Sequence, residues 1–450
     1  MLDRRSGVSF LTGRAGTGKS TLIEHWRQSR SDRNIVMLAP TGIAALNVNG
    51  QTIHSFLHAR PGVSVEQAGE TGRRYRRDAF YRLIDALIID EISMVRADLM
   101  DCLDAFLKAA RSSRLPFGGV RLILVGDLLQ LPPVVTRDDM DAFRTIWPGP
   151  WFFQAHAMRP VFEGRDVGFT SHGLTVTHRQ HDREFIRLLN ALRDGSITQT
   201  GLDELNRRVR PAGEGIVLTG VNRTATVINT RHLEDLPGPE HVSVAVREGE
   251  WNPQLTPAPE RLRLRDGMRV MMLANDRQGR WVNGSMGVLD HWDGRVAHIR
   301  LDDGTSVGTG THSWQITRMR VTDRNGVKRL EPQVLGSYTQ LPFTYGWAVT
   351  IHKSQGMTLD RAVMDLSRTF APGMGYVALS RVERMSGLYL AGVNERMFAV
   401  SADAVMLDGD LRGRSQAASA RLGDEGVAAF RPQTPHEDEP AGEFEQAELF

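Results

Sequence analysis

Residues 8–27 read VSFLTGRAGTGKSTLIEHWR, an apolar run followed by a glycine-rich turn and a helical pattern. The turn, GRAGTGKS at 13–20, fits the spacing G-x-x-x-x-G-K-[ST] in the strand-to-helix context that this pattern requires. Its glycines let successive backbone N–H groups curl around phosphate oxygens, and the helix N-terminus adds its positive dipole end. We therefore predict a phosphate site made by Gly13, Ala15, Gly16, Thr17, Gly18, Lys19, Ser20 and Thr21.

Acidic and amide side chains follow two further apolar runs. ALIIDEISM at 86–94 places Asp90 and Glu91 at a strand end, where a metal ion or polar partner is needed to stabilise the charge. We expect Ser20 and Asp90 to bind Mg²⁺, and Glu91 to activate an attacking water. LILVGDLLQLPPV at 122–134 adds Gln130, which can hydrogen-bond both a γ-phosphate and a water, although a plain polar loop is an equal alternative.

The composition is that of a soluble globular protein with 41% hydrophobic and 24% charged residues over 450 residues. That length fits two or three domains, and we find no apolar run long enough for a membrane span. The single cysteine, Cys102, is expected to be a core residue in a reduced, cytoplasmic chain. Residues 423–450 hold eight acidic side chains against Arg431, so a basic body carries an acidic tail. This asymmetry favours a polyanionic partner.

Buried-strand patterns at 8–12, 35–39, 87–89 and 120–125 alternate with helical patterns, which indicates an α/β fold with a parallel sheet over 1–170. An arginine-rich stretch at about 57–82 looks like an irregular surface insertion. A second α/β region covers 171–239 and 336–410, with strand patterns at 174–176, 216–219, 345–350 and 362–366. Short alternating strands at 240–335 predict a small β-barrel inserted in it, and 411–450 is expected to be a disordered acidic tail.

Eight segments in order give the chain a specific resemblance. They are GRAGTGKS, LAPTGIAALNVNGQTIHSF at 38–56, LIIDEISM at 87–94, FGGVRLILVGDLLQLPPV at 117–134, LTVTHRQ at 174–180, NGSMG at 283–287, VTIHKSQGMTLD at 349–360 and YVALSRV at 376–382. Over about residues 8–400 the chain resembles the Pif-type (petite integration frequency) helicases, in the 5′-to-3′ branch of helicase superfamily 1. RecD-type helicases share several segments but match TIHSF and FGGVRLILVGD less well.

The resemblance implies two RecA-like P-loop motor domains, with ATP and its Mg²⁺ in the cleft between them, and a β-barrel inserted in the second motor. For strand separation, our candidate wedge is the arginine-rich insertion at about 57–82 in the first motor. Arg179 and Arg381 match the arginines that reach the γ-phosphate from the second motor, and Gly356 matches a residue on the nucleotide side. An arginine placed in this way stabilises phosphoryl transfer by about 10³–10⁵. Together with Lys19, Glu91 and Gln130, these arginines form the expected catalytic set.

Single-stranded DNA and its junctions with duplex are the implied partner. The residues that match DNA-facing segments are Pro40, Thr41, Thr52, His54, Ser55 and Phe56 in the first motor, and Thr350, His352, Lys353 and Ser354 in the second. Hydroxyls and amides suit phosphate oxygens, and an aromatic ring can stack on a base. Considered without the resemblance, Phe56 reads as core packing and both histidines read as structural.

The implied activity is ATP-dependent 5′-to-3′ translocation on single-stranded DNA with unwinding of duplex or structured DNA, by a monomer located at the bacterial nucleoid. A translocase that displaces proteins without separating strands, and an inactive DNA-binding scaffold, are the alternatives. The last five residues, QAELF at 446–450, resemble the Q-x-x-L-F peptide by which bacterial replication proteins dock on the sliding clamp, through Gln446, Leu449 and Phe450. A chance match in a biased tail is an equal alternative.

Overall fold

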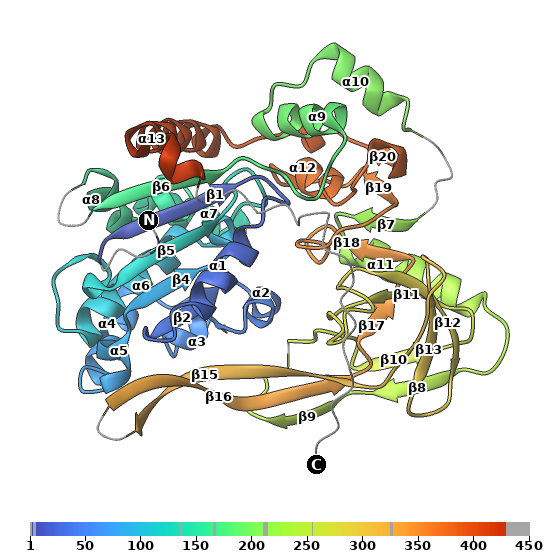
Figure 1. The fold of residues 1–450 in the computed structure, drawn as a ribbon, viewed down its shortest axis with the longest axis horizontal. Coiled ribbons are helices and arrows are strands. Elements are labelled where there is room, and N and C mark those ends of the chain that lie inside the picture. The colour runs from blue at the N-terminus through green and yellow to red at the C-terminus, as the bar shows by residue number, and fades with distance from the viewer. Residues whose placement is uncertain are drawn as a thin grey trace, which may run out of the picture.

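The strand before the predicted phosphate loop lies inside a six-stranded parallel sheet (Figure 1). The unit built on this sheet is the predicted first motor domain, called the first motor below, and the later α/β unit is called the second motor. This computed structural model describes residues 2, 6–135, 137–164, 168–209, 215–253, 255–324 and 327–428. The strand order is β3-β2-β4-β5-β1-β6. The strands are β1 (Val8–Gly13), β2 (Ile35–Ala39), β3 (Gln51–Thr52), β4 (Ala86–Ile89), β5 (Arg121–Gly126) and β6 (Phe169–Leu174). The α/β prediction is confirmed, and the sheet continues beyond the predicted boundary at residue 170.

Eight α-helices accompany this sheet in the described part of the first motor. They are α1 (Lys19–Gln28), α2 (Gly42–Asn47), α3 (Ile53–Phe56), α4 (Val65–Arg74), α5 (Ala79–Leu83), α6 (Ala97–Ala110), α7 (Arg137–Ile146) and α8 (Arg159–Phe162). Cys102 on α6 is 1% exposed, as expected for a core residue.

The stretch at 57–82 contains the helix α4 and most of α5, joined by turns, so its prediction as an irregular segment is wrong for these helices. Ser64 and Gln67 form a capping box that starts α4. Small residues let α4 approach α6 closely, since a Cβ on Gly72 would lie 2.4 Å from the Phe106 carbonyl oxygen. The arginines indicate only the solvent-facing side of α4. The small residues of α4 determine how it packs against α6.

The second motor is built on a four-stranded parallel sheet with the order β18-β7-β19-β20. Its strands are β7 (Ile216–Thr219), β18 (Ala348–Thr350), β19 (Ala362–Leu366) and β20 (Leu388–Val393). Its helices are α9 (Arg183–Asp194), α10 (Gln199–Asn206), α11 (Asn222–Glu234) and α12 (Met374–Leu379). The strand predicted from Leu174 instead belongs to β6 in the first sheet.

An all-β unit is inserted between α11 and β18, and its strands pair antiparallel in three sheets, β10-β8, β14-β13-β12-β11-β17 and β15-β16-β9. It continues to Tyr345, past the predicted limit at 335. Asp303-Gly304 turns the chain between β13 and β14, as its sequence predicts. The strands are β8 (His241–Val244), β9 (Val246–Gly249), β10 (Arg261–Leu264), β11 (Arg269–Met272), β12 (Met286–Trp292), β13 (Ala297–Leu301), β14 (Ser306–Thr309), β15 (His312–Arg324), β16 (Val327–Gln340) and β17 (Phe343–Tyr345).

The long hairpin β15–β16 extends from the all-β unit beneath the first motor (Figure 1). The Leu330 amide donates to Asn34 Oδ1 at 2.8 Å, and Arg329 donates to the Ser31 carbonyl at 3.1 Å. Met319 and Val321 of the hairpin pack against the first-motor core. The inserted unit is therefore bound to both motors.

Residues 402–428 form the helix α13 (Ala402–Ala428), so the prediction of disorder from residue 411 is wrong for this part. The helix follows the second motor but packs on the first, next to β6 (Figure 1). Leu411 is 1% exposed in the first-motor core, and the Gly173 amide donates to Ser415 Oγ at 3.0 Å. The glycine and acidic content of this segment predicts a disordered tail. Its buried side chains instead hold the segment in place as a helix. The predicted clamp-binding residues Gln446, Leu449 and Phe450 lie outside the described residues.

Among the described residues, no helix is both long enough and apolar enough to cross a membrane.

Candidate functional site

The phosphate loop has the backbone conformation that its glycines permit. Gly16 and Gly18 have φ angles of 74° and 79°, a region that favours glycine. Lys19 Nζ donates to the carbonyls of Gly13 at 2.7 Å and Arg14 at 3.1 Å. The ammonium group thus lies across the mouth of its own loop. The structure places all eight predicted phosphate-site residues in this loop and at the start of α1, with Ser20 and Thr21 exposed.

The acidic pair lies next to the loop, at the end of β4. Asp90 accepts a hydrogen bond from the Ser20 hydroxyl, and burial raises the pKa of Asp90 above its usual range. Burial, reinforced by the charge of Asp90, raises the pKa of Glu91 to about 7. Desolvation lowers the pKa of Lys19, with Asp127, Glu91 and Asp90 opposing that shift. A carboxyl group poised near neutrality is suited to taking a proton from water.

Ser20 and Asp90 are a chemically suitable pair for Mg²⁺. Both provide hard oxygen donors, they are in contact, and Mg²⁺ in such sites keeps waters and phosphate oxygens as its other ligands. No cluster of three or more His, Cys, Asp or Glu side chains able to hold a metal occurs in the described ranges. The protein alone therefore supplies only part of a coordination shell, which a bound triphosphate would complete.

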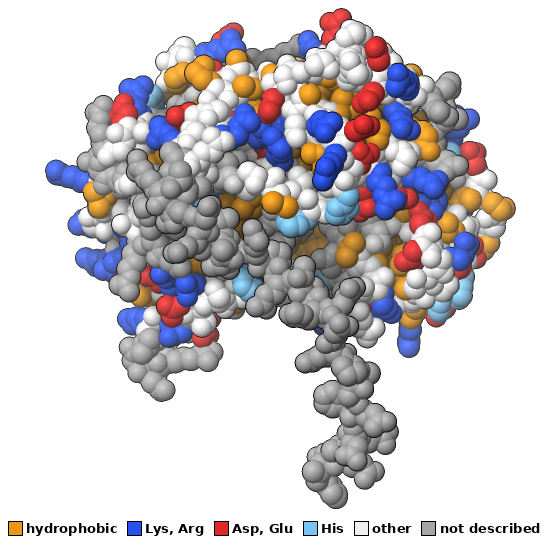
Figure 2. All heavy atoms as spheres, turned by 45° about the horizontal axis from the view of Figure 1, so that its top comes forward, with side chains coloured by type: hydrophobic (Ala, Val, Ile, Leu, Met, Phe, Trp, Pro, Cys, Tyr) orange, Lys and Arg blue, Asp and Glu red, His pale blue; other side chains and the backbone are white. Residues whose placement is uncertain are grey.

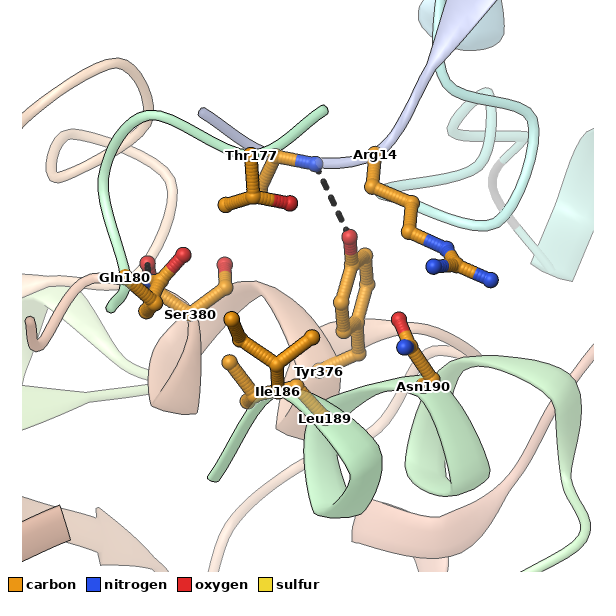
Figure 3. Close-up of a pocket in the computed structure, with 9 residues that line it drawn as sticks. Arg14, Thr177, Gln180, Ile186, Leu189, Asn190, Tyr376 and Ser380 are labelled. Carbon is orange, nitrogen blue, oxygen red and sulfur yellow. Dashed lines mark hydrogen bonds between the residues drawn. The ribbon is translucent and has the colours of Figure 1, made fainter. Parts of the chain in front are cut away.

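Two second-motor residues that the sequence did not single out reach directly into this site. Gln355 Nε2 donates to Glu91 Oε2 at 2.9 Å and to Gln130 Oε1 at 3.3 Å. The Tyr376 hydroxyl accepts from the Ala15 amide at 2.9 Å (Figure 3). The motifs that contain Gln355 and Tyr376 are HKSQG and YVALSR. From the sequence, these motifs predict site roles only for neighbouring residues. Only the three-dimensional fold shows that Gln355 and Tyr376 bridge the two motors.

Arg179 and Arg381 lie at this interface, but they donate to second-motor acceptors. Arg179 donates to Thr358 Oγ1 at 2.9 Å and to the carbonyls of Ser380 and Gly356 at 3.2 and 3.3 Å. Arg381 donates to the Val377 carbonyl at 2.8 Å and to Ser380 Oγ at 2.7 Å.

Neither arginine has a carboxylate within salt-bridge distance in the described part of the chain. Burial, together with the positive charge of Arg179, lowers the pKa of Arg381 to about 9. Two neighbouring guanidinium groups held by neutral acceptors favour an anionic ligand.

A small pocket beside the loop, with a volume of only about 10 Å³, is lined by both motors. Arg14 and Ala15 belong to the first motor, whereas Gln180, Asn190 and Tyr376 come from the second (Figure 3). A Cβ on Gly16 would come within 2.5 Å of Arg179 Cβ, so the segment that carries the THRQ motif lies against the phosphate loop. The loop is therefore enclosed by the second motor.

Comparisons with known proteins agree with this arrangement. The family model described as PIF1-like helicase matches residues 1–202. The chain is 34% identical over 409 residues to the ATP-dependent DNA helicase Pif1 of Bdellovibrio bacteriovorus, covering 88% of this chain and 87% of that protein. The chain belongs to the PIF1-like helicases. It spans 57% of the length of the longer human ATP-dependent DNA helicase PIF1.

Solved structures of PIF1-like helicases are also similar. Bacteroides sp Pif1 in complex with ADP-AlF4 matches with a TM-score of 0.80 at 30% identity, covering 92% of this chain and 94% of that one. The TM-score is 0.61 against Bacteroides Pif1 bound to ssDNA, at 31% identity and with coverage of 92% and 95%. The TM-score against unliganded Pif1 from Bacteroides sp is 0.79, so the present conformation is closer to the unliganded protein and to the ADP-AlF4 complex than to the complex with ssDNA.

The residues expected to face DNA in the first motor of this PIF1-like helicase cluster at two short helix starts. The Thr41 hydroxyl accepts from the Ala44 amide at 3.3 Å, and the Thr52 hydroxyl accepts from the Ser55 amide at 3.1 Å. These hydroxyls are therefore N-caps as well as candidate phosphate contacts. Pro40 and His54 are partly exposed beside them.

Phe56 corrects the expectation of a base-stacking residue. Its side chain is 2% exposed and its ring lies 5.5 Å from Tyr81, 6.0 Å from Phe106 and 6.3 Å from Phe80, measured between centroids. The ring belongs to an aromatic core cluster of the first motor. A buried aromatic position next to a DNA-facing motif gives the same sequence signal as an exposed one.

The second-motor residues divide in the same way. Thr350 and Ser354 are buried at 4% and 0% exposure, and the Ser354 hydroxyl donates to the Ile351 carbonyl at 2.9 Å. They shape the loop, so the prediction of direct DNA contact is wrong for these two side chains. His352 and Lys353 reach the surface. Phe370, which the sequence did not single out, is 51% exposed and stacks 6.1 Å from His352.

An open cavity of about 430 Å³ separates the first motor from the β15–β16 hairpin. Ser55 and His58 line one side, and Arg318 and Arg320 of β15 line the other. On the face drawn in Figure 2, Lys and Arg side chains lie among Asp and Glu side chains rather than in one continuous basic patch. The placement of these residues, rather than net charge, therefore favours a DNA site here.

Proposed function

We propose that this PIF1-like helicase is an ATP-dependent 5′-to-3′ DNA helicase that translocates on single-stranded DNA and unwinds duplex or structured DNA. One observation carries the proposal. Gln355 of the second motor donates directly to Glu91 of the first, which places the expected catalytic base at the junction of the two motors. ATP hydrolysis at that junction changes the contact between the two motors, both of which bind DNA in this proposal. The names of the homologues support the same activity.

In the proposed mechanism, Lys19 exchanges its loop carbonyls for the β- and γ-phosphates, and the loop amides hold the phosphate oxygens. Mg²⁺, when bound by Ser20 and Asp90, neutralises charge on the phosphates. Glu91 accepts the proton of the attacking water, and Gln130 orients that water. Gln355 couples this pair to the second motor, because it contacts both.

Arg179 and Arg381 provide the proposed response to the γ-phosphate. Their guanidinium groups donate to neutral oxygens, and an anionic phosphate is a stronger acceptor than a carbonyl. Transfer of these hydrogen bonds to the γ-phosphate pulls the second motor onto the first. Hydrolysis and phosphate release reverse the exchange, so that the motors alternate their hold on the strand.

The proposed DNA track runs over Thr41, Thr52 and Ser55 in the first motor and over His352 and Lys353 in the second. Phe370 extends the track as an exposed ring next to His352. We further propose that the α4–α5 region at 57–82 acts as the wedge at the junction, where each separated base pair costs roughly 1.4 kcal/mol of stacking. We also propose that the inserted all-β unit is a small barrel, and that it covers the DNA strand on the side opposite the track.

The test combines two assays on the full chain. ATP hydrolysis is measured with and without single-stranded DNA, and unwinding is then measured on duplexes with 5′ or 3′ overhangs and on forked duplexes. We expect DNA-stimulated hydrolysis and unwinding from the 5′ overhang only. Hydrolysis without unwinding of any substrate would favour the protein-displacing translocase, and absence of hydrolysis would favour the inactive scaffold.

The variant Lys19→Ala is expected to lose ATP hydrolysis and unwinding but to keep single-stranded DNA binding. Its matched control is Lys108→Ala, which removes a partly exposed lysine on α6 that pairs with Asp104. Normal hydrolysis by Lys19→Ala would contradict the phosphate assignment.

A further inference from the structure

Asp127 lies at the end of β5 and is fully buried between the two motors. Arg193 of α9 donates to Asp127 Oδ1 at 2.7 Å, and the Tyr376 hydroxyl donates to Asp127 Oδ2 at 3.3 Å. A first-motor carboxylate is thus held by two second-motor side chains. Burial alone would raise the pKa of Asp127, but the charges of Arg193 and then Lys19 lower it below its usual range. The carboxylate therefore stays charged.

The chain of contacts continues into the C-terminal helix. Arg193 donates from Nη2 to Asp408 Oδ1 at 3.0 Å and from Nη1 to Asp408 Oδ2 at 3.1 Å. Arg193 and Asp408 are 3% and 1% exposed. Since α13 also packs on β6, Asp408 connects three parts of the fold, namely both motors and the helix that follows them.

The other end of this chain touches the phosphate loop. The Tyr376 hydroxyl, which donates to Asp127, also accepts a hydrogen bond from the Ala15 amide (Figure 3). The backbone after Asp127 leads to Gln130, and its path is confined by the second motor, because a Cβ on Gly373 would lie 2.4 Å from the Gln130 carbonyl oxygen. A shift of Asp127 therefore moves both the loop and the water-orienting glutamine.

We propose that Asp408 and Arg193 are positioning residues for ATP hydrolysis, acting through Asp127 and Tyr376 on the phosphate loop. The inference rests on the proposed function and adds to it a role for the C-terminal helix. Among the described residues Asp408 pairs with Arg193 and Arg412, and neither partner belongs to the phosphate loop or to the residues assigned to DNA. Removal of the Asp408 carboxylate leaves Arg193 with Asp127 and Asp194 as its partners in the described part of the chain, so that the guanidinium can turn away from the β5 end.

The experiment compares Asp408→Asn with Asp410→Asn in the full chain. Asp410 lies on the same helix, is about half exposed and pairs only with Arg414 among the described residues, so it is a matched control. We expect Asp408→Asn to lower kcat of DNA-stimulated hydrolysis by roughly 10- to 100-fold, as a small misplacement of a catalytic group does, with KM for ATP nearly unchanged. Asp410→Asn should behave like the wild type. Asp408→Glu, which restores the charge, should recover part of kcat.

Tyr376→Phe breaks the same chain at the phosphate loop and removes only a hydroxyl, so it serves even where Asp408→Asn fails to fold. It should also lower kcat, and the double variant should lose less than the product of the two single losses. An unchanged kcat in Asp408→Asn or in Tyr376→Phe, or fully multiplicative losses, would overturn the proposal. An inactive wild type would refute the proposed function and this inference with it, whereas an active wild type with an unaffected Asp408→Asn refutes the inference alone.

Discussion

Two phenylalanines are expected to respond in opposite ways to the same change. Phe56 lies in a DNA-facing motif but is 2% exposed, whereas Phe370 lies in a less distinctive loop and is 51% exposed beside His352. We predict that Phe56→Ala reduces stability and leaves DNA affinity intact. Phe370→Ala should reduce affinity for single-stranded DNA and leave stability intact.

The magnitudes follow from the surroundings of each ring. Phe56 packs against Tyr81, Phe80 and Phe106, and truncation of such a buried ring costs about 3–5 kcal/mol. Truncation of the exposed Phe370 should change stability by about 0.5 kcal/mol or less. Loss of one base stacked on Phe370 costs about 1–3 kcal/mol, which is roughly a 5- to 150-fold rise in Kd.

Stability is measured by denaturant unfolding, and affinity by fluorescence anisotropy with a labelled single strand at fixed salt. Phe56→Leu tests the packing explanation, since it should restore part of the lost stability. Leu115→Ala removes another exposed apolar side chain, 48% exposed, and controls for unspecific loss of surface area. A folded Phe56→Ala protein with weakened DNA binding, or a Phe370→Ala protein with normal binding, would refute the reasoning.

Three other predictions concern the chemistry and the tail. With Glu91 as the base, kcat/KM for ATP should rise with pH through about 7 and then level off, because the carboxylate form is the active one; a profile flat from pH 6 to 8 would exclude this role. Chelation of Mg²⁺ should abolish hydrolysis, and Asp90→Asn should raise the Mg²⁺ concentration needed for half-maximal activity, read from a titration that also includes the wild type. Deletion of 446–450 should abolish capture by a sliding clamp at unchanged ATPase activity; absence of capture by the full-length chain would end that hypothesis.

The strands β1, β2, β4, β5, β7 and β19 could be predicted because each is a continuous apolar run, whereas the short β3, the polar β6 and β20 were not. The predicted runs at 35–39, 216–219 and 362–366 coincide with β2, β7 and β19. Motif spacing also located Lys19, Asp90 and Glu91, because a phosphate loop and a strand-end acid depend on local backbone geometry. Periodicity and motifs therefore identified the half of the site that the first motor contributes.

The remaining features depend on contacts between distant segments. Gln355 and Tyr376 reach the phosphate loop only because the second sheet places them there, and no local pattern separates them from their motif neighbours. The helix α13 was missed because its composition is polar and glycine-rich, whereas its fixed position depends on a few buried side chains such as Leu411 and Asp408. Burial also separates Phe56 and Ser354 from true surface residues, and burial is set by the fold.

The hydrogen bonds of the site also limit how tightly a nucleotide can bind. Lys19, Arg179 and Arg381 each donate to neutral oxygens in this conformation, so part of their hydrogen-bonding capacity is already used. An arriving triphosphate must replace these acceptors, and it gains only the difference between a hydrogen bond to a charged acceptor, about 1.5–3 kcal/mol, and one to a neutral acceptor, about 0.5–1.5 kcal/mol. Because this difference is small for each group, we expect nucleotide binding at the proposed site to be reversible once the γ-phosphate is lost. A motor that must release its product in every cycle requires that property.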